Sequence, residues 1–265
     1  MSLAASLRER TPGLFLALRT LRYALSPERL DPETEAIART LCGPDLRVLS
    51  GPFAGLRYLP FASGSGLLPK LAGSYELEIH AAVEAAIGRR PARVVNVGCG
   101  EGYYAVGLAR RLPEARVHAF DTDVVARQRT RRLARENGLS EQLQVGGLCR
   151  LDDLRRLAGP GSLVVCDCEG CERFLLDPAR VPELAASDLI VELHDFIDPT
   201  ISTSLLERFR ATHDAQIYSM ADRSAFHLPA LDGLGPERRA TALWEGRPEG
   251  MQWVWFQARA SEGRS

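Results

Sequence analysis

Two short acidic segments hold the residues whose types and spacing could carry out chemistry. One is Asp167-Cys168-Glu169-Gly170-Cys171-Glu172, and the other is Glu192-Leu193-His194-Asp195; each directly follows an apolar stretch. Histidine is the side chain whose ordinary pKa lies nearest neutrality, so His194 is the first candidate for a proton acceptor. Asp167 and Glu192 complete the set of expected catalytic residues. The alternative for His194 is a structural role in which it bonds a loop carbonyl.

A glycine-rich segment, Gly98-Cys99-Gly100-Glu101-Gly102, forms a second candidate site. Residues that lack a Cβ allow the backbone to approach a ligand closely. Asp121 ends the next apolar segment, where its carboxylate could accept hydrogen bonds from both hydroxyls of a ribose. A dinucleotide-binding pattern requires glycine where this chain has Tyr103, so an NAD site is the weaker interpretation. The two features together predict a ligand that contains adenosine.

The elements that must position these segments follow an alternating strand and helix pattern, which is typical of an α/β fold with a parallel sheet. In such sheets ligands bind beyond the carboxyl ends of the strands, so both candidate sites should meet at one edge. We predict a doubly wound, mostly parallel sheet that ends in an antiparallel C-terminal strand pair. The expected strands cover residues 94–97, 117–120, 143–145, 163–166, 189–193, 216–219 and 252–257.

The first ninety residues precede this pattern and are expected to pack on the core as an N-terminal extension, residues 1–90, in front of a catalytic domain, residues 91–265. Within the extension we expect helices over residues 11–25 and 32–41 and a hairpin over residues 47–61. Ser74 is the expected N-cap of a further helix that ends at Gly88. Residues 221–250, which contain Arg247, are expected to be a substrate lid or an ordinary surface loop.

The segments from Val94 to Gly102 and from His118 to Asp121 resemble the first two motifs of class I S-adenosylmethionine-dependent methyltransferases. The resemblance implies a Rossmann-like fold, S-adenosylmethionine as cofactor and S-adenosylhomocysteine as product. That family usually has an acidic residue at position 96 to hold the methionine ammonium, and an acidic residue after the third strand to contact the adenine; this chain has Asn96, and it has Val145-Gly146-Gly147-Leu148-Cys149 after that strand. The implied cofactor-binding residues are Asn96, Gly98, Cys99, Gly100, Gly102, Asp121, Thr122, Leu148 and Asp167.

The two acidic segments are similar to those of FkbM-type methyltransferases, which have an Asp-x-Glu-Gly-x-Glu run after strand four and Glu-x-His after strand five. Members of that family methylate hydroxyl groups on sugars, macrolides and other secondary metabolites. The resemblance therefore implies O-methylation of a small metabolite or sugar. A non-catalytic protein that binds S-adenosylmethionine through the same fold is the alternative, and Asn96 keeps it open.

Composition narrows the choice of partners. Lys plus Arg number 33 against 34 Asp plus Glu, a net charge of −1, so a field that would attract a phosphate backbone is missing. The apolar stretch from Leu14 to Leu18 is short and is followed by Arg19, which argues against a membrane span or a signal segment. We expect a cytoplasmic protein with a small-molecule substrate and no nucleic-acid or membrane partner, and a homodimer stays open.

The six cysteines are expected to be reduced thiols, and no metal site is predicted. Cys166, Cys168 and Cys171 are spaced like metal ligands, but lone cysteines are commonly small core residues. The alternative metal site is Mg²⁺ held by Asp167 and Asp195, as in catechol-type methyltransferases, because hard oxygen ligands suit that ion. The catalytic lysine of that family is absent, since Gly170 stands in its place.

Overall fold

The structure is a computed structural model that describes residues 30–63 and 65–259. The helix predicted over residues 11–25 lies outside these ranges. None of the helices in the described part of the chain is long and apolar enough to cross a bilayer.

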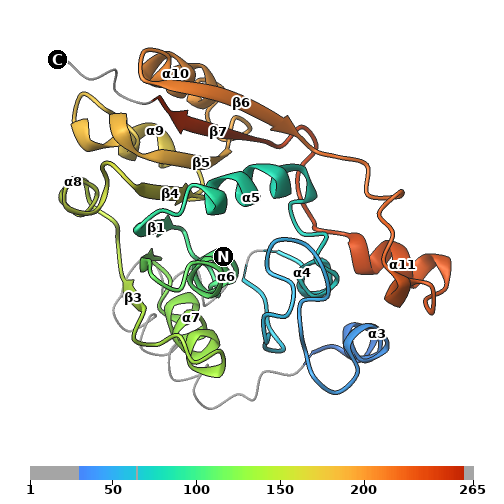
Figure 1. The fold of residues 1–265 in the computed structure, drawn as a ribbon. Helices are drawn as coiled ribbons and strands as arrows, with labels where there is room; N and C mark the ends of the chain where they lie inside the picture. The colour runs from blue at the N-terminus through green and yellow to red at the C-terminus, as the bar shows by residue number, and fades with distance from the viewer. Residues whose placement is uncertain (1–29, 64, 260–265) are drawn as a thin grey trace, which may run out of the picture.

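The centre of the molecule is a seven-stranded sheet in the order β3-β2-β1-β4-β5-β7-β6 (Figure 1). The strands from β1 to β5 pair in parallel, whereas β7 pairs antiparallel to both β5 and β6. The predicted doubly wound sheet with an antiparallel C-terminal pair is therefore confirmed. The strands are β1 (Arg93–Val97), β2 (Arg116–Phe120), β3 (Leu143–Gly146), β4 (Ser162–Cys166), β5 (Asp188–Leu193), β6 (His213–Ser219) and β7 (Gln252–Ala258).

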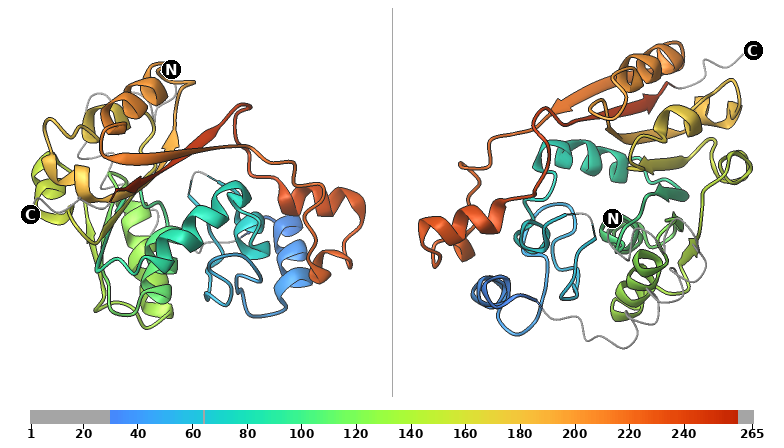
Figure 2. Two further views of the ribbon diagram at one scale, coloured as in Figure 1. Left: turned by 45° about the horizontal axis from the view of Figure 1, so that its top comes forward. Right: turned by 180° about the vertical axis from the view of Figure 1, so that it is seen from behind.

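Helices cover both faces of the sheet (Figure 2). Successive strand residues point to opposite faces, so Val94 joins one apolar core and Val95 joins the other. The first core is closed by α5 (His80–Gly88), α6 (Tyr103–Arg111) and α7 (Val124–Glu136). The second is closed by α8 (Leu151–Leu157), α9 (Glu172–Leu175) and α10 (Ile201–Phe209). Burial on both faces explains why the parallel strands are almost continuously apolar.

A small helical layer lies to one side of the sheet and brings the N-terminal extension into contact with the excursion before β7. It contains α3 (Pro32–Cys42) and α4 (Leu67–Ala72), which contact each other, and α11 (Pro236–Leu243), which contacts α4 (Figure 1). The α3 helix begins as predicted, because Asp31 accepts a hydrogen bond from the Thr34 N–H at 3.0 Å and proline follows the cap. The excursion over residues 221–250 is therefore partly helical and packed.

Two expectations for the extension were wrong in detail. The hairpin over residues 47–61 is shorter than expected: its arms pair through one antiparallel bridge between Arg47 and Arg57, and the N–H groups of Val48 and Tyr58 donate to the Leu56 and Leu46 carbonyls. Ser74 does not cap a helix: its buried hydroxyl has no hydrogen-bond partner, and α5 begins only at His80, after a short 3-10 turn. The left-handed backbone of Glu76, with φ of 51°, prevents the helix from starting earlier.

Candidate active site

A cavity of about 590 Å³ opens at the carboxyl ends of the parallel strands, where the sequence placed it. The glycine-rich loop after β1 forms one wall, and the segments after β2, β3, β4 and β5 form others, together with residues of the N-terminal extension and residues near Arg247. Of the predicted site residues, the cavity is lined by Gly98, Gly100, Asp121, Thr122, Leu148, Asp167, Glu192 and His194.

The glycine-rich loop is fixed by backbone hydrogen bonds to the neighbouring strand. The N–H groups of Gly98 and Cys99 donate to the Phe120 carbonyl at 2.8 and 3.0 Å. The Gly100 N–H donates to Asp121 Oδ2 at 2.8 Å, so the loop also orients the carboxylate at the end of β2. Burial is the main cause of a raised pKa at Asp121, which also accepts a hydrogen bond from the Asp123 N–H.

A buried glutamate within the loop anchors it to the N-terminal extension. The Glu101 carboxylate accepts hydrogen bonds from the Tyr58 hydroxyl at 2.6 Å and from the Ser63 N–H at 2.9 Å, and it forms an ion pair with Lys70. Sequence reasoning missed this role, because partners that lie far apart in the chain leave no spacing signal. The extension thus helps to shape the candidate cofactor loop.

Three residues of the predicted cofactor set do not line this cavity. Asn96 lies beneath the loop beside a smaller cavity of about 50 Å³, and its buried Oδ1 atom has no hydrogen-bond partner. The Cys99 thiol turns toward the Thr130 hydroxyl at 3.5 Å, and burial raises its pKa to about 12. Gly102 precedes α6 and packs against Thr130. Cys99 and Gly102 therefore shape the loop, and their side-chain positions do not face the larger cavity.

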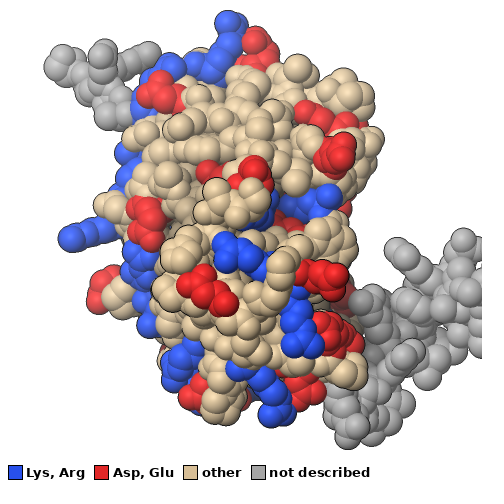
Figure 3. Space-filling view, turned by 90° about the vertical axis from the view of Figure 1, so that its right-hand side faces the viewer, with Lys and Arg blue, Asp and Glu red and all other residues tan. Residues whose placement is uncertain are grey.

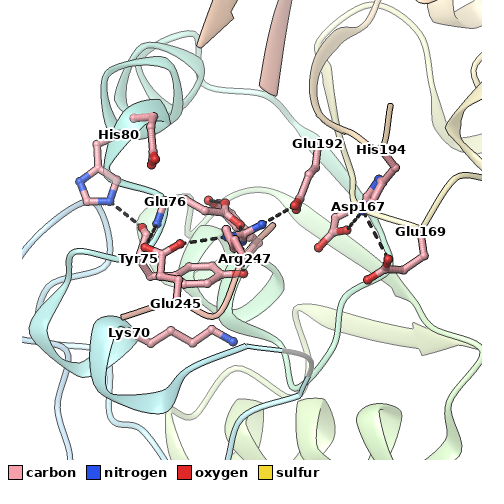
Figure 4. A network of polar contacts seen from close by, with 12 residues as sticks. Lys70, Tyr75, Glu76, His80, Asp167, Glu169, Glu192, His194, Glu245 and Arg247 are labelled. Carbon is pink, nitrogen blue, oxygen red and sulfur yellow. Dashed lines mark hydrogen bonds and ion pairs between the residues drawn. The ribbon is translucent and has the colours of Figure 1, made fainter. Parts of the chain in front are cut away.

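His194 follows β5 and stands between carboxylates from the segment after β4. Its Nδ1 atom lies 2.8 Å from Glu172 Oε1, although the angle departs from that of a well-aligned hydrogen bond. Its Nε2 atom lies 3.5 Å from Asp167 Oδ1 and 3.6 Å from Glu169 Oε2 (Figure 4). Burial acts to lower the pKa of His194, but Glu172 and the other carboxylates outweigh it and the net pKa is raised. Glu172 thus contacts the imidazole on its Nδ1 side, and Nε2 faces the cavity.

Glu192, at the end of β5, shares this edge of the cavity with Asp167. Burial and the mutual repulsion of acids raise the pKa of Glu192 to about 10 and that of Asp167 to about 6. Arg247 forms ion pairs with Glu192 and Glu76, and it contacts Glu245 at 2.9 Å (Figure 4). Arg247 belongs to the excursion that was expected to be a lid or a surface loop. Its ion pairs instead fix its side chain in the wall of the cavity.

Of the two acids of the Mg²⁺ alternative, Asp167 lines the cavity and Asp195 does not. Asp195 accepts a hydrogen bond from the Ser202 N–H at 2.9 Å and so fixes the start of α10. Asp167, Glu192 and His194 do offer ligand atoms within 4.8 Å of one another. The Arg247 guanidinium already supplies positive charge to Glu192, and Glu172 engages the other nitrogen of His194.

The expectation that all cysteines are reduced was also wrong, because Cys168 and Cys171 form a disulfide. The bond closes the short turn that contains Glu169. In the sequence, Glu169 lies between Asp167 and Glu172, the two acids near the ring nitrogens of His194. Cys166 lies on the buried strand, and its Sγ atom is 3.6 Å from that of Cys168. Burial raises the pKa of the Cys166 thiol well above its ordinary value, which keeps it out of exchange with the disulfide.

Several solved structures are similar to this chain at low sequence identity. One is the O-methyltransferase TomG from Streptomyces achromogenes, in complex with SAM, with 15% identity, a TM-score of 0.45, and 91% of this chain and 96% of that chain covered. Another is an O-methyltransferase from Bacillus cereus, in complex with SAH, with 12% identity, a TM-score of 0.45, and coverage of 91% and 97%. A third is the C-terminal domain of precorrin-6Y C5,15-methyltransferase from Rhodobacter capsulatus, with 17% identity, a TM-score of 0.45, and coverage of 69% and 86%.

Comparison with protein families gives a match over the part of the chain that forms the cavity. No curated protein matches the chain. Residues 94–173, from β1 to the start of α9, match the family described as a methyltransferase domain. This range contains the glycine-rich loop, Asp121 and Asp167. The sheet order and the glycine-rich loop agree with this match, and residues 94–173 are similar to a methyltransferase domain.

Proposed function

We propose that the protein is an O-methyltransferase of the FkbM type that methylates a hydroxyl group of a small metabolite or sugar. The observation that carries this proposal is His194, whose Nδ1 atom is held by buried Glu172 while Nε2 faces the cavity beside Asp167. Methyl transfer is an in-line displacement: the acceptor oxygen forms a bond to the methyl carbon as the bond from that carbon to sulfur breaks. His194 takes the hydroxyl proton, leaving S-adenosylhomocysteine and a methyl ether.

The cofactor would lie along the glycine-rich loop, in contact with the backbone of Gly98 and Gly100. Asp121 would accept hydrogen bonds from the ribose hydroxyls, and Thr122 and Leu148 would lie near the adenine. The unpartnered Oδ1 atom of Asn96 is a suitable acceptor for the methionine ammonium, because a buried acceptor without a donor is costly. Asp167, at the end of β4, would lie near the methyl group.

One face of the molecule carries mixed charge. Figure 3 shows acidic and basic side chains interspersed over the face that it draws, without one continuous basic patch. Such a face does not attract a phosphate backbone.

Calorimetry tests the cofactor part of the proposal. The protein should bind S-adenosylmethionine and S-adenosylhomocysteine at micromolar concentrations and should not prefer NAD. Asp121→Ala should weaken binding by about 1.5 to 3 kcal/mol, because a charged acceptor is lost from a partly desolvated site. An unchanged dissociation constant would remove Asp121 from the site.

Turnover tests the catalytic part once an acceptor has been found. His194→Ala should lower kcat about a hundredfold or more and leave cofactor affinity nearly intact. His227→Ala is the matched control, because its side chain is exposed and lies outside the cavity lining. If Asp167→Asn or EDTA abolishes turnover and His194→Ala does not, the role of base or of metal ligand belongs to Asp167. Cofactor binding without transfer to any acceptor would favour the non-catalytic alternative.

A further inference from the structure

At neutral pH the acceptor end of the cavity carries the negative charge of Asp167 and Glu169, since Glu192 with its raised pKa holds its proton, and the described residues of its lining include no unpaired Lys or Arg. Asp167, Glu169 and Glu192 line it, and Arg247 is the one Lys or Arg within the described lining. The Arg247 guanidinium is already engaged by Glu192, Glu76 and Glu245, and it donates to the Tyr75 hydroxyl at 2.7 Å. An acceptor with a negative group would meet carboxylates there and no available partner.

Glu169 is the acid best placed to contact an acceptor directly. Its side chain is 77% exposed, and its contact with His194 is long, at 3.6 Å. Its backbone is left-handed, with φ of 56°, and the following Gly170 has φ of 95°. A residue other than glycine in this conformation is strained, and such strain gathers at functional sites. The turn therefore presents a carboxylate into the cavity mouth.

Distance limits where a positive group of the acceptor can lie. Asp167 Oδ1 and Glu169 Oε2 approach the same atom, His194 Nε2, at 3.5 and 3.6 Å. A hydroxyl whose proton goes to Nε2 therefore lies next to both carboxylates. A cation attached within a bond or two of the hydroxyl carbon can contact either of them.

An apolar wall adjoins these acids. Phe196 lines the cavity with its side chain exposed, and its ring centroid lies 5.6 Å from that of His194. Ile197 is also exposed and lies against Gly170, where a Cβ would be 3.1 Å from Ile197 Cγ2. Exposed apolar side chains at the mouth of a polar cavity mark a surface that a ligand covers.

We propose that the acceptor is a cyclic vicinal amino alcohol, the chemistry found in amino sugars and aminocyclitols. The face of its ring lies on Phe196, its hydroxyl meets His194, and the neighbouring protonated amine contacts Glu169. The inference rests on the proposed function and names its substrate class.

Three cyclohexane probes differ in the charge of the group next to the hydroxyl: trans-2-aminocyclohexanol is positive, cyclohexane-1,2-diol is neutral and 2-hydroxycyclohexanecarboxylate is negative. Their binding to the protein saturated with S-adenosylhomocysteine is measured by calorimetry, so turnover is not required. The amine should bind at least about tenfold more tightly than the carboxylate, with the diol between them, and added salt should reduce the difference. Methyl transfer to the same probes should follow the same order.

Glu169→Gln should bring the three affinities close together, whereas Glu207→Gln should preserve their order. Glu207 is the matched control because it is similarly exposed on α10 and lies outside the cavity lining. Equal or tighter binding of the carboxylate, an unchanged order in Glu169→Gln, or no binding of any probe at millimolar concentration would overturn the inference. The proposed function survives those results if the cofactor binds and another hydroxyl is methylated, and it fails separately if the cofactor does not bind.

Discussion

The backbone carbonyl of Asp167 occupies the space where a side chain at position 98 would lie. A Cβ built on Gly98 would be 1.5 Å from that oxygen, and Gly98 also has a φ of 75°. The Asp167 N–H donates to the Val97 carbonyl at 3.0 Å. The cofactor loop and the acid at the end of β4 therefore cannot move independently.

Gly98→Ala should accordingly damage two properties at once. The added methyl must displace the segment that begins at Asp167, so both the thermal midpoint and the affinity for S-adenosylhomocysteine should fall. Gly88→Ala is the control, because a Cβ there meets nothing within 4 Å and alanine favours the end of α5. Differential scanning calorimetry and titration of both variants provide the measurement. Normal cofactor affinity in Gly98→Ala would disprove the coupling.

Glu172→Gln should shift the titration of His194. Removing the negative charge behind Nδ1 lowers the raised pKa of the imidazole, since one of the groups that favour its protonated form is lost. The base acts when deprotonated, so the acidic limb of the pH-rate profile should move to lower pH, and kcat should fall about tenfold or more. NMR titration of the ring protons reports the pKa directly. His80, whose pKa burial lowers, is an internal reference that should not move.

Stability should depend on pH with opposite signs at two aspartates. Burial raises the pKa of Asp167 from 3.8 to about 6, so the folded state holds the proton more tightly and the free energy of unfolding falls as pH rises through this range. Hydrogen bonds from Thr200 lower the pKa of Asp198 from 3.8 to about 2, so its contribution is present above 3.8 and is lost as pH falls. Urea unfolding of Asp167→Asn and Asp198→Asn across these pH values should remove one slope each. The same change in both variants would contradict the assignment.

Arg247→Gln should be strongly destabilising. The substitution removes the cation that Glu76, Glu192 and Glu245 share in a buried wall, a loss of about 3 to 5 kcal/mol. The charge left unpaired is chiefly that of Glu76, because Glu245 keeps its contact with Arg223 at 2.9 Å and Glu192 holds its proton. Arg39→Gln, which removes an exposed pair with Glu35, should cost less than about 1 kcal/mol. Denaturant unfolding at neutral and acidic pH compares them, and the difference should shrink in acid as the carboxyls take up protons. Similar losses in both variants would show that the wall tolerates uncompensated charge.

The disulfide predicts a thiol count. Without reductant the unfolded protein should expose the four cysteines Cys42, Cys99, Cys149 and Cys166, and after reduction all six. The loop that Cys168 and Cys171 close is short, so its reduction should cost at most about 2 kcal/mol of stability. Titration with a chromogenic disulfide reagent in denaturant gives the count. A count of six thiols before reduction would contradict the disulfide and would show that Cys168 and Cys171 are reduced, as the sequence analysis expected.

The parallel sheet was predictable because burial on both faces leaves a local signal. Residues 94–97 and 163–166 are apolar runs bounded by turns, and the structure extends each by a single residue. The carboxyl-end rule then brought Asp121, Asp167 and His194 to one cavity, which the structure confirms as a location. Their roles stay predictions.

The features that could not be predicted from the sequence depend on tertiary contacts and on the backbone conformation of single residues. Glu101 looked like a spacer between two glycines, yet Tyr58, Ser63 and Lys70 bury its carboxylate. Ser74 had the residue type of a helix cap, but the left-handed Glu76 that follows moves the helix start to His80. Tertiary packing decided these cases over local preference.

The position of β7 imposes an order on synthesis. It inserts between β5 and β6, so during translation β5 emerges well before the strand that covers its open edge. Until residues 252–258 leave the ribosome, the hydrogen-bonding edge of the strand that contains Glu192 is exposed to other chains. A nascent chain paused in the excursion before β7 would therefore carry an unfinished catalytic wall, and this interval is the one in which a chaperone would be needed.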